Sequence, residues 1–127
     1  MPTMSELLAE NTHARRKVLS EDDWDVIDGS IADLEATGIR SAVLKPGDTA
    51  PAFALPNALG QTVTSADLLA RGPLVVKFYR GAWCSYCNVE VRALMGVLEE
   101  IRGLGADMVA ITPELPDQMV TMQEKHD

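Results

Sequence analysis

A strand–helix–strand pattern over residues 74–112 constrains the fold of this 127-residue chain more than any other feature. Residues 74–79 and 106–112 are short apolar runs rich in β-branched side chains, which is typical of strands buried on both faces. Between them, apolar side chains recur at helical spacing over residues 85–102. Two strands joined through a helix are parallel and right-handed in nearly all proteins. The sequence therefore predicts the α/β class.

Two amphipathic helices are predicted in the first third of the chain. Apolar residues recur at helical spacing from Met4 to Val18 and again from Trp24 to Leu34. The second helix begins with a capping box at residues 20–23, in which Asp replaces the usual Glu or Gln, and Gly38 ends it. Apolar stripes of this kind usually mark packing surfaces. We therefore expect residues 1–42 to form a helical extension that packs on a core or on a partner subunit.

Further short elements are predicted from local residue preferences. Pro and Gly residues separate these segments from the longer ones, and the polar residues beside them favour turns and helix caps. The predicted elements are two strands at 52–56 and 61–64 around a hairpin turn at 57–60, a helix over 66–70 capped by Ser65, and a last helix from Pro116 through Met119 and Met122.

Charge and hydropathy exclude several partners. The formal net charge is −8, and nucleic-acid binding needs a basic face, so no nucleic-acid partner is expected. No run approaches the roughly 20 apolar residues that span a bilayer, and residues 1–17 lack the features of a secretory signal. We therefore expect a cytoplasmic protein without a membrane partner. Cytoplasmic thiols stay mostly reduced, so a close cysteine pair there is more often redox-active or metal-binding than structural.

Cys84 and Cys87 are the two cysteines of the chain, and they follow the first buried strand at the start of the long helix. Ligands and reactive groups collect at this end of parallel strands. A helix N-terminus offers unpaired N–H groups and partial positive charge, which favour a thiolate over a thiol. Two intervening residues let the sulfurs form a disulfide within one helical turn. Arg80 and Lys77 would add positive charge nearby.

The cysteine pair has two other interpretations. A zinc site needs two more ligands, yet His13 and His126 lie far away in the sequence, so no metal is expected. The pair could also be inert, because free cysteines are among the most buried residues. Redox chemistry by Cys84 and Cys87 is the favoured interpretation, and it requires no cofactor in this chain.

Four motifs of the sequence carry a resemblance to a known family. They are Lys45-Pro46-Gly47-Asp48, residues 50–56 (Ala-Pro-Ala-Phe-Ala-Leu-Pro), Gly60-Gln61-Thr62-Val63 and residues 75–90 around Trp83-Cys84-Ser85-Tyr86-Cys87. Together these motifs resemble the peroxiredoxin family, also called the alkyl hydroperoxide reductase/thiol-specific antioxidant (AhpC/TSA) family. The resemblance implies a thioredoxin-like fold over residues 43–127, and the reduction of peroxides or disulfides by cysteine. It also implies an external thiol reductant of the thioredoxin or glutathione kind.

Two registers of the resemblance assign the cysteines differently. The peroxiredoxin register makes Cys87 the attacking cysteine and Glu90 its acidic neighbour, but it places Arg80 and Cys84 where the family has proline and a hydroxyl residue. The thioredoxin-like register makes Cys84 the attacking thiol and Cys87 the resolving one. We expect Cys84 to be the more exposed sulfur at the helix tip and Cys87 to point inward. Our hypothesis is that Cys84 reacts first.

Charged and aromatic residues flank the cysteine pair. Trp83 and Tyr86 could shield the sulfurs or dock a partner, although aromatic residues beside a loop more often serve packing. Arg92 is expected on the surface as a partner of Glu90 or Glu99.

The resemblance also implies that this thioredoxin-like domain is incomplete at its C-terminus. Relatives continue with two strands, a loop with a cis-proline and a helix. Unpaired strand edges favour association, so a homodimer is one expected state. Three functions follow: a dithiol peroxide reductase, a protein disulfide oxidoreductase, or a binding or structural module that has lost catalysis.

Overall fold

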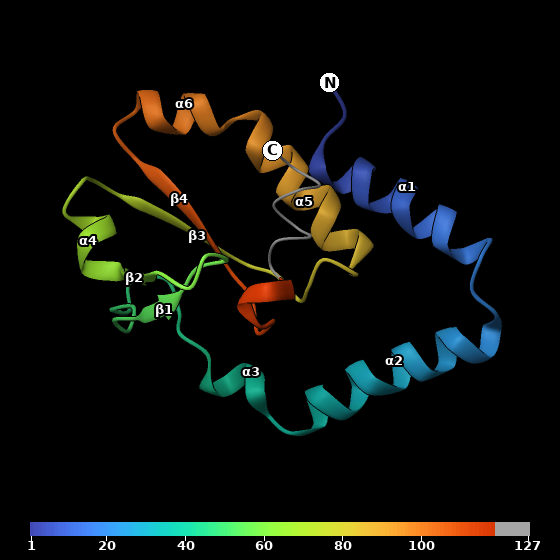
Figure 1. The fold of residues 1–127 in the computed structure, drawn as a ribbon. Coiled ribbons are helices and arrows are strands. Elements are labelled where there is room, and N and C mark those ends of the chain that lie inside the picture. Colours follow the sequence, from blue (N-terminus) through green and yellow to red (C-terminus); the bar gives the residue numbers. More distant parts are fainter. Residues whose placement is uncertain (119–127) are drawn as a thin grey trace. The chain divides into compact units, whose positions relative to one another are not determined.

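A computed structural model describes residues 1–118. The chain divides into two compact units, one of residues 9–51 and one of residues 1–8 together with the chain from residue 52 onward. Their elements are drawn in Figure 1, and they are α1 (Met4–Arg16), α2 (Glu21–Ala36), α3 (Ile39–Ala42), β1 (Ala54–Pro56), β2 (Thr62–Thr64), α4 (Ser65–Leu69), β3 (Leu74–Phe78), α5 (Ser85–Gly96), α6 (Leu98–Gly103) and β4 (Asp107–Ile111).

The predicted N-terminal helices are confirmed. The Ser20 hydroxyl accepts the N–H of Asp23, and the Asp23 carboxylate accepts the N–H of Ser20, so the Asp-containing capping box forms. After α2, Gly38 adopts a left-handed backbone (φ 74°), where glycine carries no steric penalty. Trp24 is the buried side chain of α2, and the Arg16 guanidinium lies 4.6 Å from the centroid of its ring.

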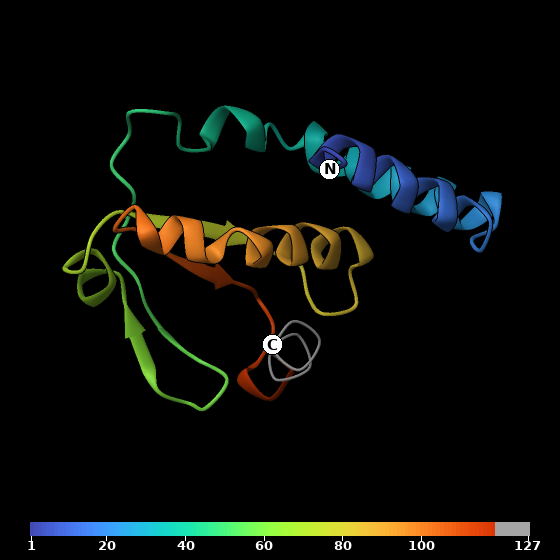
Figure 2. The same cartoon turned by 90° about the horizontal axis from the view of Figure 1, so that it is seen from above.

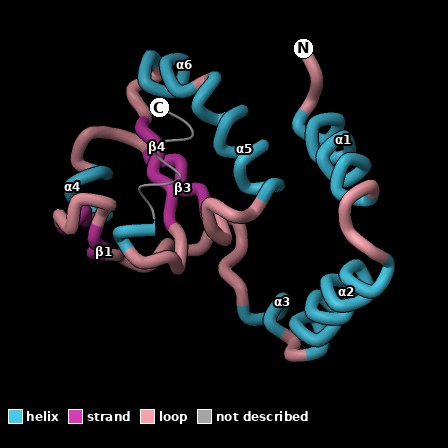
Figure 3. Tube along the Cα trace, turned by 45° about the vertical axis from the view of Figure 1, so that its right-hand side comes forward, coloured by secondary structure: helices cyan, strands magenta, loops and turns pink. Residues whose placement is uncertain are grey.

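The predicted parallel unit is confirmed as well. β3 pairs with β4 in parallel, with Leu74 opposite Asp107 and Phe78 opposite Ile111. The helices α5 and α6 run back along this pair of strands in both ribbon views (Figures 1 and 2). Figure 3 shows the two strands side by side, with the cyan helices of the crossover beside them. Because the strands are parallel, the loops after β3 and after β4 meet at one end of the pair.

The helix predicted over residues 85–102 is two helices in the structure. α5 ends at Gly96, and Val97 (φ −113°, ψ 8°) leaves the helical region before α6 begins. Glycine and a β-branched valine both have low helix propensity, and together they interrupt the pattern that the apolar spacing suggested. Within residues 1–118, no helix combines the length and the apolar character needed to cross a lipid bilayer.

Burial of β3 on both faces was predicted and is wrong for this chain. Val75 and Val76 are 38% and 39% exposed, and Phe78 is 70% exposed. Within residues 1–118, β4 is the one strand paired with β3, so the other edge of β3 carries no strand. The apolar side chains of β3 are therefore more exposed than its composition predicts, because residues 1–118 pack against only part of the strand.

The hairpin prediction is confirmed, and one cap prediction is wrong. β1 and β2 pair antiparallel around the turn at residues 57–60. Thr64, rather than Ser65, caps α4 by accepting the N–H of Asp67. The buried hydroxyl of Ser65 instead accepts the N–H of Phe53 at 3.0 Å. Residues 116–118 are helical as predicted, while the rest of the last helix, with Met119 and Met122, lies outside the described residues.

Candidate active site

The structure brings Cys84 and Cys87 together at the start of α5. Cys84 is the N-cap residue (φ −83°, ψ 107°), and Cys87 lies in the first turn of the helix. Both are free thiols. Their side chains belong to one buried cluster with Tyr79, Ala82 and Val91, against which Tyr86 packs. A site of two adjacent thiols therefore forms inside the small core of this unit rather than on its surface.

The expectation that Cys84 is the more exposed cysteine is wrong. Cys84 is 4% exposed and Cys87 is 6% exposed, so neither is accessible at the helix tip. The loop before the N-terminus of α5 forms a turn. In that turn the N–H of Cys84 donates to the carbonyl of Gly81 at 3.0 Å.

Hydrogen bonds fix the loop and the sulfurs relative to each other. The N–H of Arg80 donates to Sγ of Cys87 at 3.4 Å. The side-chain amide of Asn88 donates to the carbonyls of Ala82 and Cys84, at 2.9 and 2.8 Å. Loop and first helical turn are thus held by donors from both the backbone and one side chain.

Burial changes the acidity of two groups in this cluster. It is the largest cause that raises the pKa of the Cys87 thiol, and a hydrogen bond with the Cys84 side chain raises that pKa further. The N–H groups of Arg80 and Gly81 act in the opposite direction because they stabilise a thiolate. Burial also raises the pKa of Tyr79, and the nearby carboxylate of Glu114 adds to that shift.

The charged residues near the thiols each contact a different partner. The Arg80 guanidinium lies 4.7 Å from the centroid of the Trp83 ring, and Trp83 is 65% exposed. Lys77 on β3 forms an ion pair with Glu90 on α5 instead of standing free beside the thiols.

Arg92 is exposed, as predicted, but its predicted acidic neighbours pair elsewhere. Glu90 pairs with Lys77, and Glu99 pairs with Arg102. Glu90, an expected partner of Arg92 on the same helix, therefore pairs across to Lys77 on β3 instead.

Two residues of the loop after β4 were missed in the sequence. Both carboxylate oxygens of Glu114 accept the N–H of Ala82, at 3.1 and 3.2 Å. The hydroxyl of Thr112 accepts the N–H of Glu114 at 3.3 Å and hydrogen-bonds with the Tyr79 side chain. The predicted parallel strands could have pointed to this loop, because parallel strands bring the loop after β4 to the same end at which Cys84 lies.

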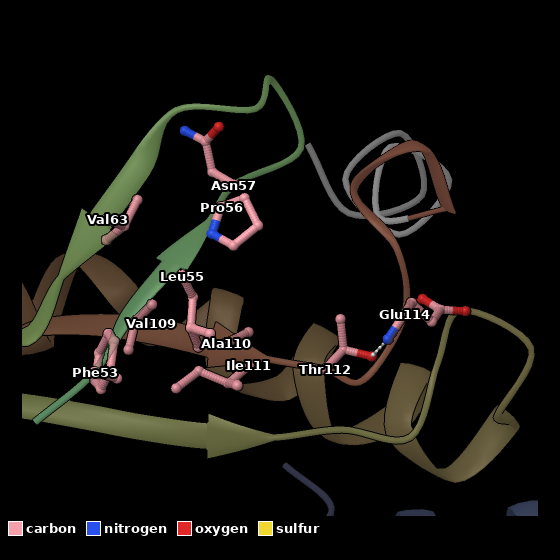
Figure 4. Close-up of a pocket in the computed structure, with 10 residues that line it drawn as sticks. All are labelled: Phe53, Leu55, Pro56, Asn57, Val63, Val109, Ala110, Ile111, Thr112 and Glu114. Carbon is pink, nitrogen blue, oxygen red and sulfur yellow. Dashed lines mark hydrogen bonds between the residues drawn. The ribbon is translucent and has the colours of Figure 1, made fainter. Parts of the chain in front are cut away.

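The same loop lines a cavity of about 240 Å³ between the hairpin and β4. Figure 4 shows apolar side chains of both elements facing one another, and the hydrogen bond from Glu114 to Thr112 at one end. The lining residues are Phe53, Leu55, Pro56, Asn57, Val63, Val109, Ala110, Ile111, Thr112 and Glu114. Thr112 and Glu114 therefore contact the cavity as well as the residues around the thiols.

The part of the chain that the structure describes holds no group of three or more His, Cys, Asp or Glu side chains placed to bind a metal ion. His13 lies in the last turn of α1, and His126 lies outside the described residues.

A parallel β3–α5–β4 unit with two thiols at the start of its helix defines a thioredoxin-like protein. A solved structure supports this fold: the thioredoxin domain of a thiol-disulfide oxidoreductase from Bacteroides vulgatus matches with a TM-score of 0.54 and 23% identity, over 65% of this chain and 59% of that chain. The model of the AhpC/TSA family matches residues 46–127, which is more than half of the sequence. The chain therefore belongs to the AhpC/TSA family.

Curated relatives are peroxiredoxins by name. Peroxiredoxin Bcp of Escherichia coli (strain K12) is 33% identical over 82 residues, which cover 65% of this chain and 52% of the relative. A protein of Mycobacterium tuberculosis (strain ATCC 25618 / H37Rv), whose name carries the word peroxiredoxin, is 35% identical over 85 residues, or 67% of this chain and 54% of the relative. The chain spans about half the length of the curated relatives it matches.

Proposed function

We propose that this chain reduces peroxides through a dithiol/disulfide cycle of Cys84 and Cys87. The observation that carries the proposal is the meeting of the two thiols in one buried cluster at the N-terminal end of α5. Membership of a thiol peroxidase family supports the same chemistry. In this proposal residues 43–127 form the catalytic domain, and residues 1–42 form its helical extension.

Cys84 forms the first covalent species in this scheme. Its thiolate attacks one peroxide oxygen, the O–O bond breaks, and the other oxygen leaves as an alcohol or water after taking a proton. The product is a sulfenic acid on Cys84. The sulfur of Cys87 then displaces water from it and forms the disulfide, so the peroxide gains two electrons and the two thiols lose them. An external thiol reductant of the thioredoxin or glutathione kind restores both thiols by exchange.

The acidity of Cys87 supports this order. Burial and a hydrogen bond with the Cys84 side chain raise the pKa of Cys87, so Cys87 stays largely a thiol near neutral pH. The opposite order, in which Cys87 attacks, has its own support in the N–H of Arg80 on the Cys87 sulfur. The two orders differ in which sulfur carries the sulfenic acid.

Single substitutions separate the two orders. We expect Cys84→Ser to abolish peroxide-dependent thiol oxidation, and Cys87→Ser to retain the first step and accumulate a sulfenic acid on Cys84. Intact mass after trapping with dimedone reads this out, with the double variant and free cysteine as controls. The reverse result would assign the attack to Cys87. Full turnover by both single variants, or a wild-type rate no faster than that of free cysteine, would end the peroxidase proposal.

Reduction of protein disulfides is a second candidate function. It is favoured by Trp83, which is 65% exposed beside the buried Cys84 and stacks with the Arg80 guanidinium, so it offers a flat surface to a partner. Under this candidate, Cys87→Ser traps a mixed disulfide with a substrate protein, and Trp83→Ala lowers insulin reduction. If neither peroxide nor insulin is reduced faster than by free cysteine, the remaining candidate is a binding or structural module without catalysis.

A further inference from the structure

Glu114 reaches from the loop after β4 to the loop that precedes the thiols, 32 residues away in the sequence. Both of its carboxylate oxygens accept the N–H of Ala82, at 3.1 and 3.2 Å. Ala82 is buried, at 6% exposed, and Glu114 is half-buried. A hydrogen bond between a carboxylate and a backbone N–H is stronger than one between neutral groups, and partial burial shields it from water.

The carboxylate packs directly against the backbone of the loop. A Cβ atom added at Gly81 would lie 2.6 Å from Oε1 of Glu114 and would overlap the Trp83 ring. A side chain at position 81 would therefore push the carboxylate away from Ala82. The neighbouring carbonyl of Gly81 accepts the N–H of Cys84, so the turn that holds the first cysteine begins one residue before Ala82, which Glu114 binds.

Both backbone polar groups of Ala82 are hydrogen-bonded, its N–H in one peptide group and its carbonyl in the next. Glu114 accepts its N–H, and the side-chain amide of Asn88 donates to its carbonyl and also to the carbonyl of Cys84. Asn88 belongs to α5, and Glu114 belongs to the loop after β4. The loop that carries Cys84 is thus tied to the helix and to the neighbouring strand at the same residue.

We propose that Glu114 is a positioning residue of the dithiol site, whose carboxylate, together with Asn88, fixes the backbone on both sides of Ala82 and so holds Cys84 at the start of α5 within reach of Cys87. This role rests on the proposed dithiol function. Fixing the loop raises the effective concentration of each thiol for the other, because fewer loop conformations separate them. Releasing the loop would therefore weaken the Cys84–Cys87 disulfide relative to an external one.

The test is the equilibrium between the protein dithiol and oxidised dithiothreitol. A protein thiolate attacks the cyclic disulfide, and the second protein thiolate then displaces reduced dithiothreitol, so two electrons pass from the protein to the reagent. We expect Glu114→Ala to lower the equilibrium constant for the protein disulfide about tenfold, because the freed loop lowers the effective concentration of each thiol for the other. Glu114→Gln keeps an oxygen acceptor and should stay within about threefold of the wild type.

Glu99→Ala is the matched control, since Glu99 is an exposed carboxylate that pairs with Arg102 on α6. Equal constants for Glu114→Ala, Glu99→Ala and the wild type would overturn the proposal. This equilibrium needs no peroxide, so a chain that fails to reduce peroxides but shows the Glu114 effect would contradict the proposed peroxidase function and keep the positioning role.

A spectroscopic measurement tests the contact without depending on the stability of Glu114→Ala. The chain has two tyrosines, so Tyr86→Phe leaves Tyr79 as the one phenol whose ionisation is read by ultraviolet absorbance. The Glu114 carboxylate raises the pKa of Tyr79. Adding Glu114→Gln should therefore lower the pKa of Tyr79, while adding Glu99→Gln should leave it unchanged. An unchanged Tyr79 titration in the Glu114→Gln protein would show that the carboxylate does not occupy this place, and the proposal would fall.

Discussion

The ammonium group of Lys77 on β3 forms an ion pair with the carboxylate of Glu90, one turn beyond Cys87 on α5. Both side chains are partly buried, at 23% and 30% exposed. The pair joins the central strand to the helix that begins at the two thiols. Its contribution should lie between that of exposed ion pairs, which is small, and that of fully buried ones.

Replacing Lys77 by Met should cost about 1–2 kcal/mol of unfolding free energy, because the Glu90 carboxylate is left partly buried without its cation. Adding Glu90→Leu should recover most of that loss, since neither partner then remains unpaired. Urea titrations of the single and double variants measure both effects. A double variant as unstable as the sum of its single variants would show that the two residues do not interact.

Stability should fall as the solution becomes alkaline. The folded state raises the pKa of Cys87, so between the ordinary thiol value of about 8.5 and the raised folded value the unfolded chain carries fewer protons than the folded one. The unfolding free energy therefore decreases as pH rises through that window. Tyr79 adds a second decrease above its ordinary value of about 10. Cys87→Ser should remove the first decrease and keep the second, as measured by urea titrations at several pH values.

Ser65→Ala should destabilise the hairpin and α4 by about 1–2 kcal/mol. The buried hydroxyl accepts the N–H of Phe53, and alanine would leave that donor without its acceptor. The matched control is Ser30→Ala, because the exposed Ser30 hydroxyl bonds to a carbonyl one turn back in α2 and its loss should change little. Equal urea midpoints for the two variants would contradict the role of Ser65.

Two glycine-to-alanine substitutions should have opposite signs. Gly72 has a φ of 144°, and a Cβ there would overlap the carbonyl of Gly105 just before β4, so Gly72→Ala should cost at least about 2 kcal/mol. Gly29 lies within α2 with nothing within 4 Å of an added Cβ, so Gly29→Ala should stabilise that helix by about 0.5–1 kcal/mol. Circular dichroism during thermal unfolding measures both changes. A tolerated Gly72→Ala would mean that the approach of Gly105 is looser than the structure places it.

Local patterns in the sequence predicted those parts of the fold that depend on neighbouring residues. The capping box of Ser20 and Asp23, the hairpin and the parallel crossover each arise from spacing within a few residues or from a general rule of chain topology. The closeness of Cys84 and Cys87 belongs to the same group, because three residues along a helix make one turn.

Features that depend on long-range contacts could not be predicted in this way. The bond from Ala82 to Glu114 joins segments 32 residues apart. The parallel topology brings the two loops to one end of the strands, but no local pattern indicates which of their residues bond to each other. Burial of Cys84 depends on how the preceding loop folds, and a helix N-cap position alone suggested the opposite. The break at Val97 was hidden because apolar spacing continues across it.

The burial of both sulfurs has a consequence for how fast any reagent can modify them. A thiol that is 4% or 6% exposed reacts only during moments when the loop or the first turn of α5 opens, so the observed rate is the product of an opening equilibrium and the rate in the open state. A change that stabilises the closed native state will then slow modification of the thiols without contacting them. A compatible solute that protects this protein against heat would therefore act at the same time as an inhibitor of its oxidation.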